Sequence, residues 1–391
     1  MMAMNTFLFA TNISIFALCA VLFPLIPKIT REAYLFGVRI PTKEQNSPEA
    51  LQMKKRYRVN CYVGMGILIA LCIVQFIVVR DLTILATLYL PLLILPVFFA
   101  AFIPNWKAAT RLKAEQRWQV SSTVFADTYT ARERGRLAAL PWGWYIAGFA
   151  IITASVLIAI FRYPYLPDMI PTHFDINMQP TTWAETSWMM VLLVPLINTA
   201  MLLTMTSIAI MIGKAKMHVD QANPRLSFAQ HRVYRGRLGH AFGIITATLI
   251  LYVAAIGLMI LFPYTALSFA PAMIWGGMIA IFIPIIAIVM VVVKSGQGGC
   301  KIKINLPDDE SNAEGALIQK VHPGRGDDKY WKLGMFYYNP NDPACIIESR
   351  FGGKLSFNFA RLPAMIVTAL LALGLIATYV WVTIIAYGLV I

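Results

Sequence analysis

The run IAIFIPIIAIVMVVV at residues 279–293 has no charged side chain in fifteen consecutive positions. With its apolar neighbours it makes a stretch of about 20 residues, the length that an α-helix needs to cross a hydrocarbon core of roughly 30 Å. A strand of a transmembrane barrel would instead alternate apolar and polar residues over about ten positions. The stretch therefore predicts a transmembrane helix.

Similar stretches recur along the 391-residue chain and predict eight transmembrane helices. They cover residues 5–27, 61–79, 82–104, 142–161, 188–213, 241–262, 272–293 and 362–391. Hydrophobic residues make up 58% of the chain and charged residues only 13%, whereas soluble domains contain roughly 25% charged residues. The predicted fold class is an all-α polytopic membrane protein, and an ordinary soluble enzyme is excluded.

The net charge of +14 is concentrated in alternate loops. The first, third, fifth and seventh loops carry 31 of the 33 Lys and Arg residues, and the other loops hold only Arg80 and Arg162. This is the positive-inside pattern, so we expect the odd loops in the cytoplasm and both chain termini outside. The expected partner of this charge is anionic lipid in the inner leaflet of the membrane. Direct nucleic-acid binding is not expected.

The predicted organisation follows the loops. Residues 1–60 hold the first helix and a cytoplasmic loop, 61–141 a helical hairpin and a second cytoplasmic loop, and 142–293 the fourth to seventh helices. Residues 294–361 form a cytoplasmic linker followed by a small β-containing unit, and 362–391 form the last helix.

Two local features refine the helices. Ser47 followed by Pro48 predicts a helix start, with Ser47 as the N-cap and Pro48 at the first helical position. Pro91 and Pro96 remove backbone donors and predict a kink in the third helix.

Two further loops carry predictions. Residues 263–271, PYTALSFAP, are expected to form a short uncharged outer loop. The segments CIIESR and KLSFNFA, at 345–350 and 354–360, predict a β-hairpin. The aromatic residues nearby are expected to form a miniature core or to lie on the membrane surface; they are Tyr330, Trp331, Phe336, Tyr337, Phe357 and Phe359.

Residues 163–187, YPYLPDMIPTHFDINMQPTTWAETS, gather the polar groups of the outer side. We expect prolines to stiffen this loop, Trp183 to anchor it at the membrane interface, and His173 to form hydrogen bonds inside it. Binding of an extracellular peptide is the other role left open. One histidine with scattered carboxylates does not match the three or four ligands of a zinc site, so no metal is predicted. The residues expected to bind a ligand or to organise the loop are Pro167, Asp168, Pro171, His173, Phe174, Asp175 and Trp183.

The sequence has no persuasive catalytic constellation. It lacks HExxH, GxSxG, Walker A and CxxC patterns, and a hydrolase using His173 and Asp175 would need a nucleophile or metal that we do not identify. None of the 19 acidic residues falls within the apolar spans, where ion-coupled transporters usually keep carboxylates. A non-enzymatic, cofactor-free protein is therefore expected. A transporter, or an accessory subunit of one, for a hydrophobic or peptide substrate is the alternative.

At residues 166–183, LPDMIPTHFDINMQPTTW, the chain resembles the bacterial membrane family typified by the sporulation-delaying-protein immunity proteins. The matching residues are Leu166, Pro167, Ile170, Pro171, His173, Phe174, Pro180 and Trp183. Met178 stands where that family usually has Gly, and Thr181 where an acidic residue is common.

The second half of the seventh loop resembles a small domain of uncharacterised function that often accompanies the first. The residues of that similarity are Trp331, Gly334, Tyr337, Asn339, Asp342, Pro343, Arg350, Phe351, Gly352, Asn358 and Phe359. The motif FGVRIP at 36–41 is similar to longer members of this kind. The resemblance implies a protein that gives immunity to, or senses, a secreted antimicrobial peptide and signals by holding a regulator at its cytoplasmic loops.

Overall fold

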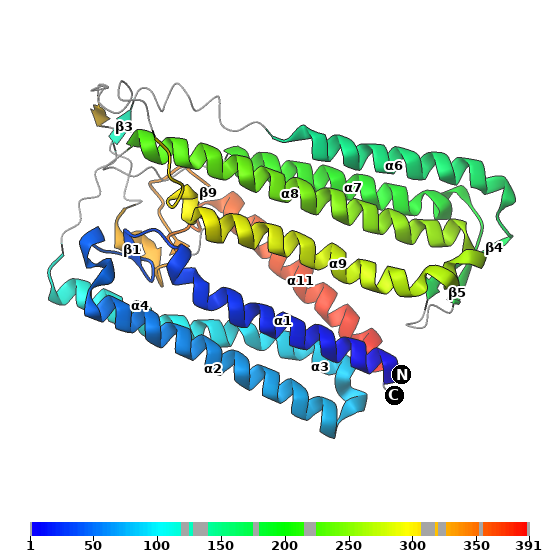
Figure 1. The fold of residues 1–391 in the computed structure, drawn as a ribbon, viewed down its shortest axis with the longest axis horizontal. Coiled ribbons are helices and arrows are strands. Elements are labelled where there is room, and N and C mark those ends of the chain that lie inside the picture. The colour runs from blue at the N-terminus through cyan, green and yellow to red at the C-terminus, as the bar shows by residue number, and fades with distance from the viewer. Residues whose placement is uncertain are drawn as a thin grey trace.

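The computed structural model describes residues 2–118, 125–127, 140–174, 180–214, 224–305, 317–319, 326–351 and 355–388. Long helices run side by side, and the strands lie at the two ends of the helices (Figure 1). In the described residues, eight helices are long and apolar enough to cross a membrane. The prediction of an all-α polytopic membrane protein is confirmed.

The first group of helices contains the first three spans and the last one. Its members are α1 (Met2–Ile29), α2 (Pro48–Val78), α3 (Thr83–Tyr89), α4 (Ile94–Glu115) and α11 (Leu362–Gly388). Helix α2 packs between α1 and α4, and α11 packs against α3.

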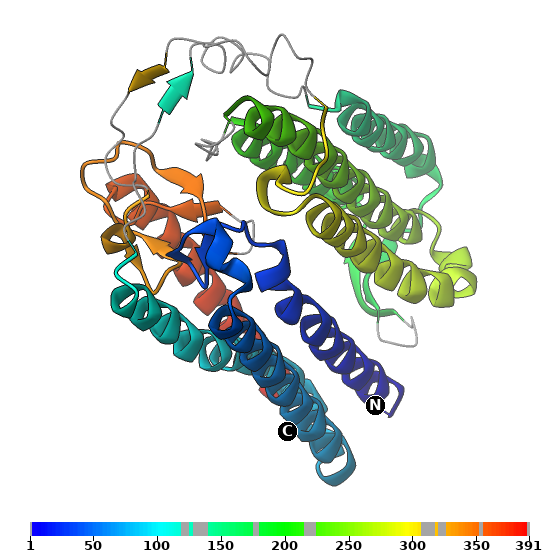
Figure 2. The ribbon, with the colours of Figure 1, turned by 60° about the vertical axis from the view of Figure 1, so that its left-hand side comes forward.

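The second group surrounds α8. Its members are α6 (Trp142–Arg162), α7 (Trp188–Lys214), α8 (Pro224–Leu261) and α9 (Pro263–Ser295). Helices α6, α7 and α9 each pack along α8. Figure 2 shows the two groups beside each other, with α1 and α9 at the contact between them.

Five two-stranded sheets occur among the described residues. They pair β1 (Tyr34–Leu35) with β2 (Val38–Arg39), β3 (Phe125–Asp127) with β6 (Leu317–Gln319), β4 (Met169–Phe174) with β5 (Pro180–Glu185), β7 (Trp331–Lys332) with β8 (Phe336–Tyr337), and β9 (Ile346–Glu348) with β10 (Leu355–Phe357). Short 3-10 helices are η1 (Thr42–Asn46), η2 (Arg80–Leu82), η3 (Leu90–Leu93), η5 (Tyr163–Tyr165), η6 (Gln297–Gly299) and η7 (Asp328–Tyr330). The antiparallel pairing of β9 and β10 confirms the predicted hairpin.

Helix starts and breaks follow from single residues. The hydroxyl of Ser47 accepts the N–H of Ala50 at 3.3 Å, which confirms the predicted N-cap. The third span is interrupted by η3 at Pro91, as predicted. Pro96 lies in the first turn of α4, where a missing N–H removes no helical bond.

The interruption at η3 is also where α11 is attached. The hydroxyl of Tyr379 in α11 donates to the carbonyl of Leu88, just before η3. The rings of Tyr379 and Tyr89 pack edge to face at 5.7 Å. A neighbouring helix thus satisfies backbone at the break, as a membrane-spanning helix requires.

Three helices are longer than predicted. Residues 263–271 are not a loop but the first turns of α9, which begins with Pro263 at its first position. Helix α8 begins at Pro224, well before the predicted span at 241–262. Helix α4 continues to Glu115. Hydropathy detects the most apolar part of a helix, so it does not detect the polar continuations of α4 and α8.

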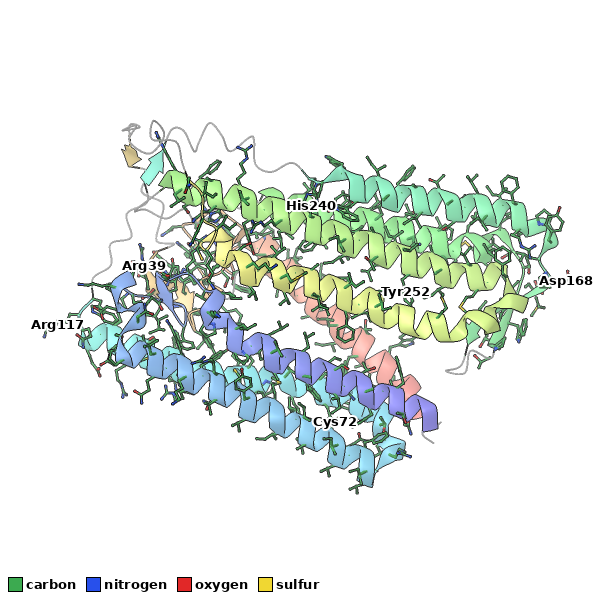
Figure 3. All side chains as sticks on the ribbon, in the orientation of Figure 1. Arg39, Cys72, Arg117, Asp168, His240 and Tyr252 are labelled. Carbon is green, nitrogen blue, oxygen red and sulfur yellow. The ribbon has the colours of Figure 1, made fainter. Side chains whose placement is uncertain are left out.

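The molecule has two distinct ends. We call the end with β1, β9 and the start of α8 the basic end, and the end with β4, β5 and both chain termini the hairpin end (Figure 1). Figure 3 places Arg39 at the basic end and Asp168 at the hairpin end. The first and seventh loops thus lie at one end and the loop at 163–187 lies at the other, which agrees with the predicted path of the chain. The side of a membrane that each end faces stays a prediction.

Candidate functional site

The hairpin of β4 and β5 carries the predicted outer-loop residues. The strands are antiparallel, with Pro171 opposite Trp183 and His173 opposite Thr182, and the register shifts on both sides of His173. Trp183 is 50% exposed, as an interfacial anchor would be. The structure describes the side chains of Pro167, Asp168, Pro171 and Trp183; Asp175 and the side chains of His173 and Phe174 lie outside the described residues.

The base of the hairpin is fixed to three helices. Thr186 donates from its N–H to the carbonyl of Asp168 at 2.9 Å and from its hydroxyl to the carbonyl of Pro167. Ile170 is completely buried and packs with Val191 of α7 and Leu261 of α8. The hairpin is therefore seated on the ends of α6, α7 and α8.

The helix ends beneath the hairpin are bound to one another. The rings of Tyr163 and Trp188 stack with their centroids 3.8 Å apart, which joins η5, directly after α6, to α7. Arg162 donates to the carbonyl of Leu261 at 3.4 Å, and its guanidinium lies 4.6 Å from the ring of Phe262. The last residue of α8 is thus bonded to the end of α6, on which the hairpin packs.

At the basic end, four aromatic residues from distant segments form one core. The ring of Phe351 lies 4.8 Å from that of Phe102 in α4, 5.9 Å from that of Phe36, and 6.3 Å from that of Tyr57 in α2. All four side chains are 2% exposed or less. The motif at 36–41 therefore packs against the seventh loop. The predicted domain boundary at 294 stays a prediction, but the core is shared across it.

Two glycines bring the first and seventh loops into backbone contact. Gly37 has φ +80° and Gly334 has φ +69°, both in the left-handed region. A Cβ on Gly37 would lie 2.1 Å from the carbonyl oxygen of Gly334, which no side chain tolerates. Arg350 of the seventh loop donates to the carbonyl of Gly37 at 3.3 Å, which also holds the two loops together.

Arg350 is a buried cation of the basic end. Its side chain is 2% exposed, is paired with Asp328, and has its guanidinium 4.8 Å from the Trp331 ring and 5.1 Å from the Tyr34 ring. The second oxygen of Asp328 accepts from Lys113 of α4 at 2.6 Å. Burial of an arginine is costly unless it is paired, so these contacts fix where the seventh loop sits.

A buried polar network holds the seventh loop itself. Tyr337 donates to Asp342 at 3.1 Å and accepts from the amide of Asn339 at 2.9 Å. The amide of Asn358 donates to the carbonyls of Asn339 and Asp342 at 2.9 and 3.0 Å. The structure thus brings together the predicted residues Trp331, Tyr337, Asn339, Asp342, Arg350 and Asn358. Hydrogen bonds join Tyr337, Asn339, Asp342 and Asn358, and ring contacts join Trp331 to Tyr337 and to Arg350.

Part of the expected miniature core is present: of the six aromatic residues named for it, Trp331 and Tyr337 are buried and Tyr330 packs against them. Trp331 and Tyr337 lie with ring centroids 5.0 Å apart and pack with Ala344 and Ile347. Phe336, on the same strand as Tyr337, is 38% exposed.

No metal centre is found among the described residues of the two ends. No three His, Cys, Asp or Glu side chains in that part of the chain lie close enough to hold a metal ion. A hydrogen bond to Asp327 raises the pKa of Lys329 above its ordinary value. Both groups are exposed to solvent, so the effect on stability is small.

A bridge between the two helix groups was not predicted. Gln297, directly after α9 and 1% exposed, accepts the N–H of Arg31 at 3.3 Å and donates to the carbonyl of Ser349. Arg31 also donates to Nε2 of His231 in α8 at 2.7 Å, and the other ring nitrogen of His231 meets the carbonyl of Ser227. The sequence marks this region only as a glycine-rich linker, so spatial contacts alone identify the bridge.

Substitution of Gly37 tests the contact between the loops. Gly37→Ala forces a Cβ into the Gly334 carbonyl at positive φ, and it should lower the free energy of unfolding by about 1–3 kcal/mol. Gly66→Ala is the control, because a Cβ there meets nothing within 4 Å. Thermal unfolding of the purified proteins in detergent measures both. Equal midpoints for the two variants would contradict the contact.

A comparison with known families places one segment of the chain. A family model described as a domain of unknown function, DUF1648, matches residues 150–199. The match covers the end of α6, the hairpin of β4 and β5, and the start of α7. Neither a curated protein nor a solved structure matches the chain. The chain is thus a multi-pass membrane protein whose hairpin segment is similar to this domain of unknown function.

Proposed function

We propose that this protein gives immunity to, or senses, a secreted antimicrobial peptide in the plasma membrane of a bacterium. Recognition is assigned to the hairpin of β4 and β5, and signalling to the basic end. The resemblance of residues 166–183 to the sporulation-delaying-protein immunity family supports the first assignment. The protein acts by binding, without a cofactor and without chemical conversion of the peptide.

The observation that carries the proposal is that one helix reaches both ends. Helix α8 has 38 residues and so extends about 57 Å. Its last residue, Leu261, packs under the hairpin through Ile170 and accepts from Arg162. Near its start, His231 contacts Arg31, and Gln230 donates to the carbonyl of Ile302 at 2.9 Å. A peptide that displaces the hairpin therefore acts on a helix that also contacts the basic end.

The bridge formed by Arg31 and Gln297 connects α8 to the seventh loop. A shift of α8 acts on Arg31 through His231, and Arg31 is held by Gln297. Gln297 also bonds to Ser349, which directly precedes Arg350 of the buried ion pair. The seventh loop is thus the natural recipient of a signal that travels along α8.

A regulatory protein is the proposed partner at the basic end. Two aromatic side chains of the seventh loop stay exposed beside its core: Phe336 at 38% and Tyr338 at 48%. Exposed aromatic residues are enriched at protein interfaces. Docking there requires the loop to keep the arrangement that the network of Asn339 and Asn358 holds.

Removal of the hairpin's exposed aromatic side chain tests the recognition step. Trp183→Ala should weaken peptide binding by about 30-fold, the loss typical of a central interface aromatic residue. His173→Ala should also reduce protection, while both variants insert at normal levels. Peptide resistance of cells and binding to purified protein measure the effects.

The matched control is Trp142→Ala, a tryptophan that is 52% exposed at the other end of α6. It should retain resistance and binding. If Trp183→Ala and His173→Ala both leave resistance unchanged at normal expression, the hairpin does not recognise the peptide.

Substitution of the bridge separates binding from signalling. Gln297→Ala removes the side chain that links Arg31 to Ser349. We expect unchanged peptide binding but at least a tenfold smaller signal, about 1.4 kcal/mol of lost coupling. A reporter of regulator release, read beside a peptide-binding assay, measures both quantities.

Gln116→Ala serves as the control, since Gln116 is exposed at the end of α4, away from the bridge. A normal signal from Gln297→Ala would show that the bridge does not transmit it. Loss of binding in the same variant would show instead that the bridge maintains the hairpin.

A further inference from the structure

An open cavity of about 1160 Å³ lies at the basic end, between the first helix group and the start of α8. Ligand sites commonly have volumes of about 300–1,000 Å³, so the cavity can hold a sizeable group. One wall comes from α1, the first loop and α2, and the other from α8 and residues 298–301. The bridging residues Arg31 and His231 line it as well.

The lining is strongly basic. Its cations are Lys28, Arg31, Arg39, Lys54, Lys55, Arg58 and Lys301. Glu32 is the one acidic residue that lines the cavity among the described residues. So large an excess of one sign in a hollow concentrates anions there.

The cations divide into two sets. The first set is buried or held by internal bonds, and Arg39 belongs to it because it is only 9% exposed. Arg31 is held by His231 and Gln297, and Lys54 donates to the backbone and side chain of Gln45 at 2.8 and 2.7 Å. The other set is exposed and forms no ion pair with the described residues; it consists of Lys28, Lys55, Arg58 and Lys301. Internal bonds thus fix the walls, while four positive charges remain to bind an anion.

Apolar surface meets this charge in the same cavity. The lining includes Pro24 and Leu25 of α1 and Tyr62 of α2, which is 56% exposed. These residues belong to two of the helices that are apolar enough to cross a membrane. A ligand that fills the cavity is therefore best matched if it has an acidic head and an apolar tail.

We infer that the cavity binds the phosphate head group of an anionic phospholipid, with the acyl chains lying along α1 and α2. Basic pockets between transmembrane helices are suited to such head groups. A soluble phosphate compound shares the head-group chemistry but leaves the apolar lining unused. The site links lipid composition to the bridge, because Arg31 and His231 line the cavity.

Native mass spectrometry of the purified full chain in detergent tests the site, with phosphatidylglycerol as the probe and phosphatidylcholine as the zwitterionic comparison. The double variant Lys55→Gln, Arg58→Gln should bind phosphatidylglycerol about 30-fold more weakly, the effect expected for two cations near an anionic head group. Lys28→Gln with Lys301→Gln, which changes both walls, should have a similar effect.

The matched control is Lys107→Gln with Arg111→Gln, two exposed cations on α4 that do not line the cavity. It removes the same charge and should change affinity by less than about threefold. Equal losses in the control and the cavity variants would overturn the site, because they would reflect general surface charge. Displacement of the lipid by an equal concentration of glycerol 3-phosphate would also overturn it and assign the cavity to a soluble anion.

Discussion

The cost of placing charge in hydrocarbon divides this protein into two ends. A charged side chain at the centre of a membrane helix costs about 2.5–3.5 kcal/mol on insertion scales, and none of the 19 acidic residues lies in the predicted apolar spans. Lys and Arg collect in alternate loops, which leaves a compact hairpin without Lys or Arg at one end and a basic, folded assembly at the other. Each end therefore has its own chemistry, and only helices can connect them.

The basic end is built jointly by segments that are far apart in the sequence. Phe36, Tyr57, Phe102 and Phe351 form its apolar centre, and the pairing of Arg350 with Asp328 fixes the seventh loop beside it. This arrangement makes the first loop part of the same unit. It also explains why a basic cavity forms there, since its walls come from both helix groups.

Local signals predicted the spans, the cap at Ser47, the break at Pro91 and the hairpin of β9 and β10, because each depends on neighbouring residues. The extension of α8, the helical start of α9 and the bridge at Gln297 were not predicted. Arg31 and Gln297 lie 266 positions apart, and tertiary packing alone sets their contact. The family resemblance identified residues of the seventh loop that contact one another in the structure. No local sequence pattern predicted the basic cavity, because its walls come from segments far apart in the chain.

The central claim is that the hairpin end and the basic end face opposite sides of the membrane, joined by α8. Cysteine labelling of intact cells with a membrane-impermeant maleimide tests it most directly, using Thr181→Cys on exposed β5 and the exposed native Cys300. The account predicts that Thr181→Cys reacts in intact cells and that Cys300 reacts only after permeabilisation. Reaction of Cys300 in intact cells, or protection of Thr181→Cys until permeabilisation, would contradict it.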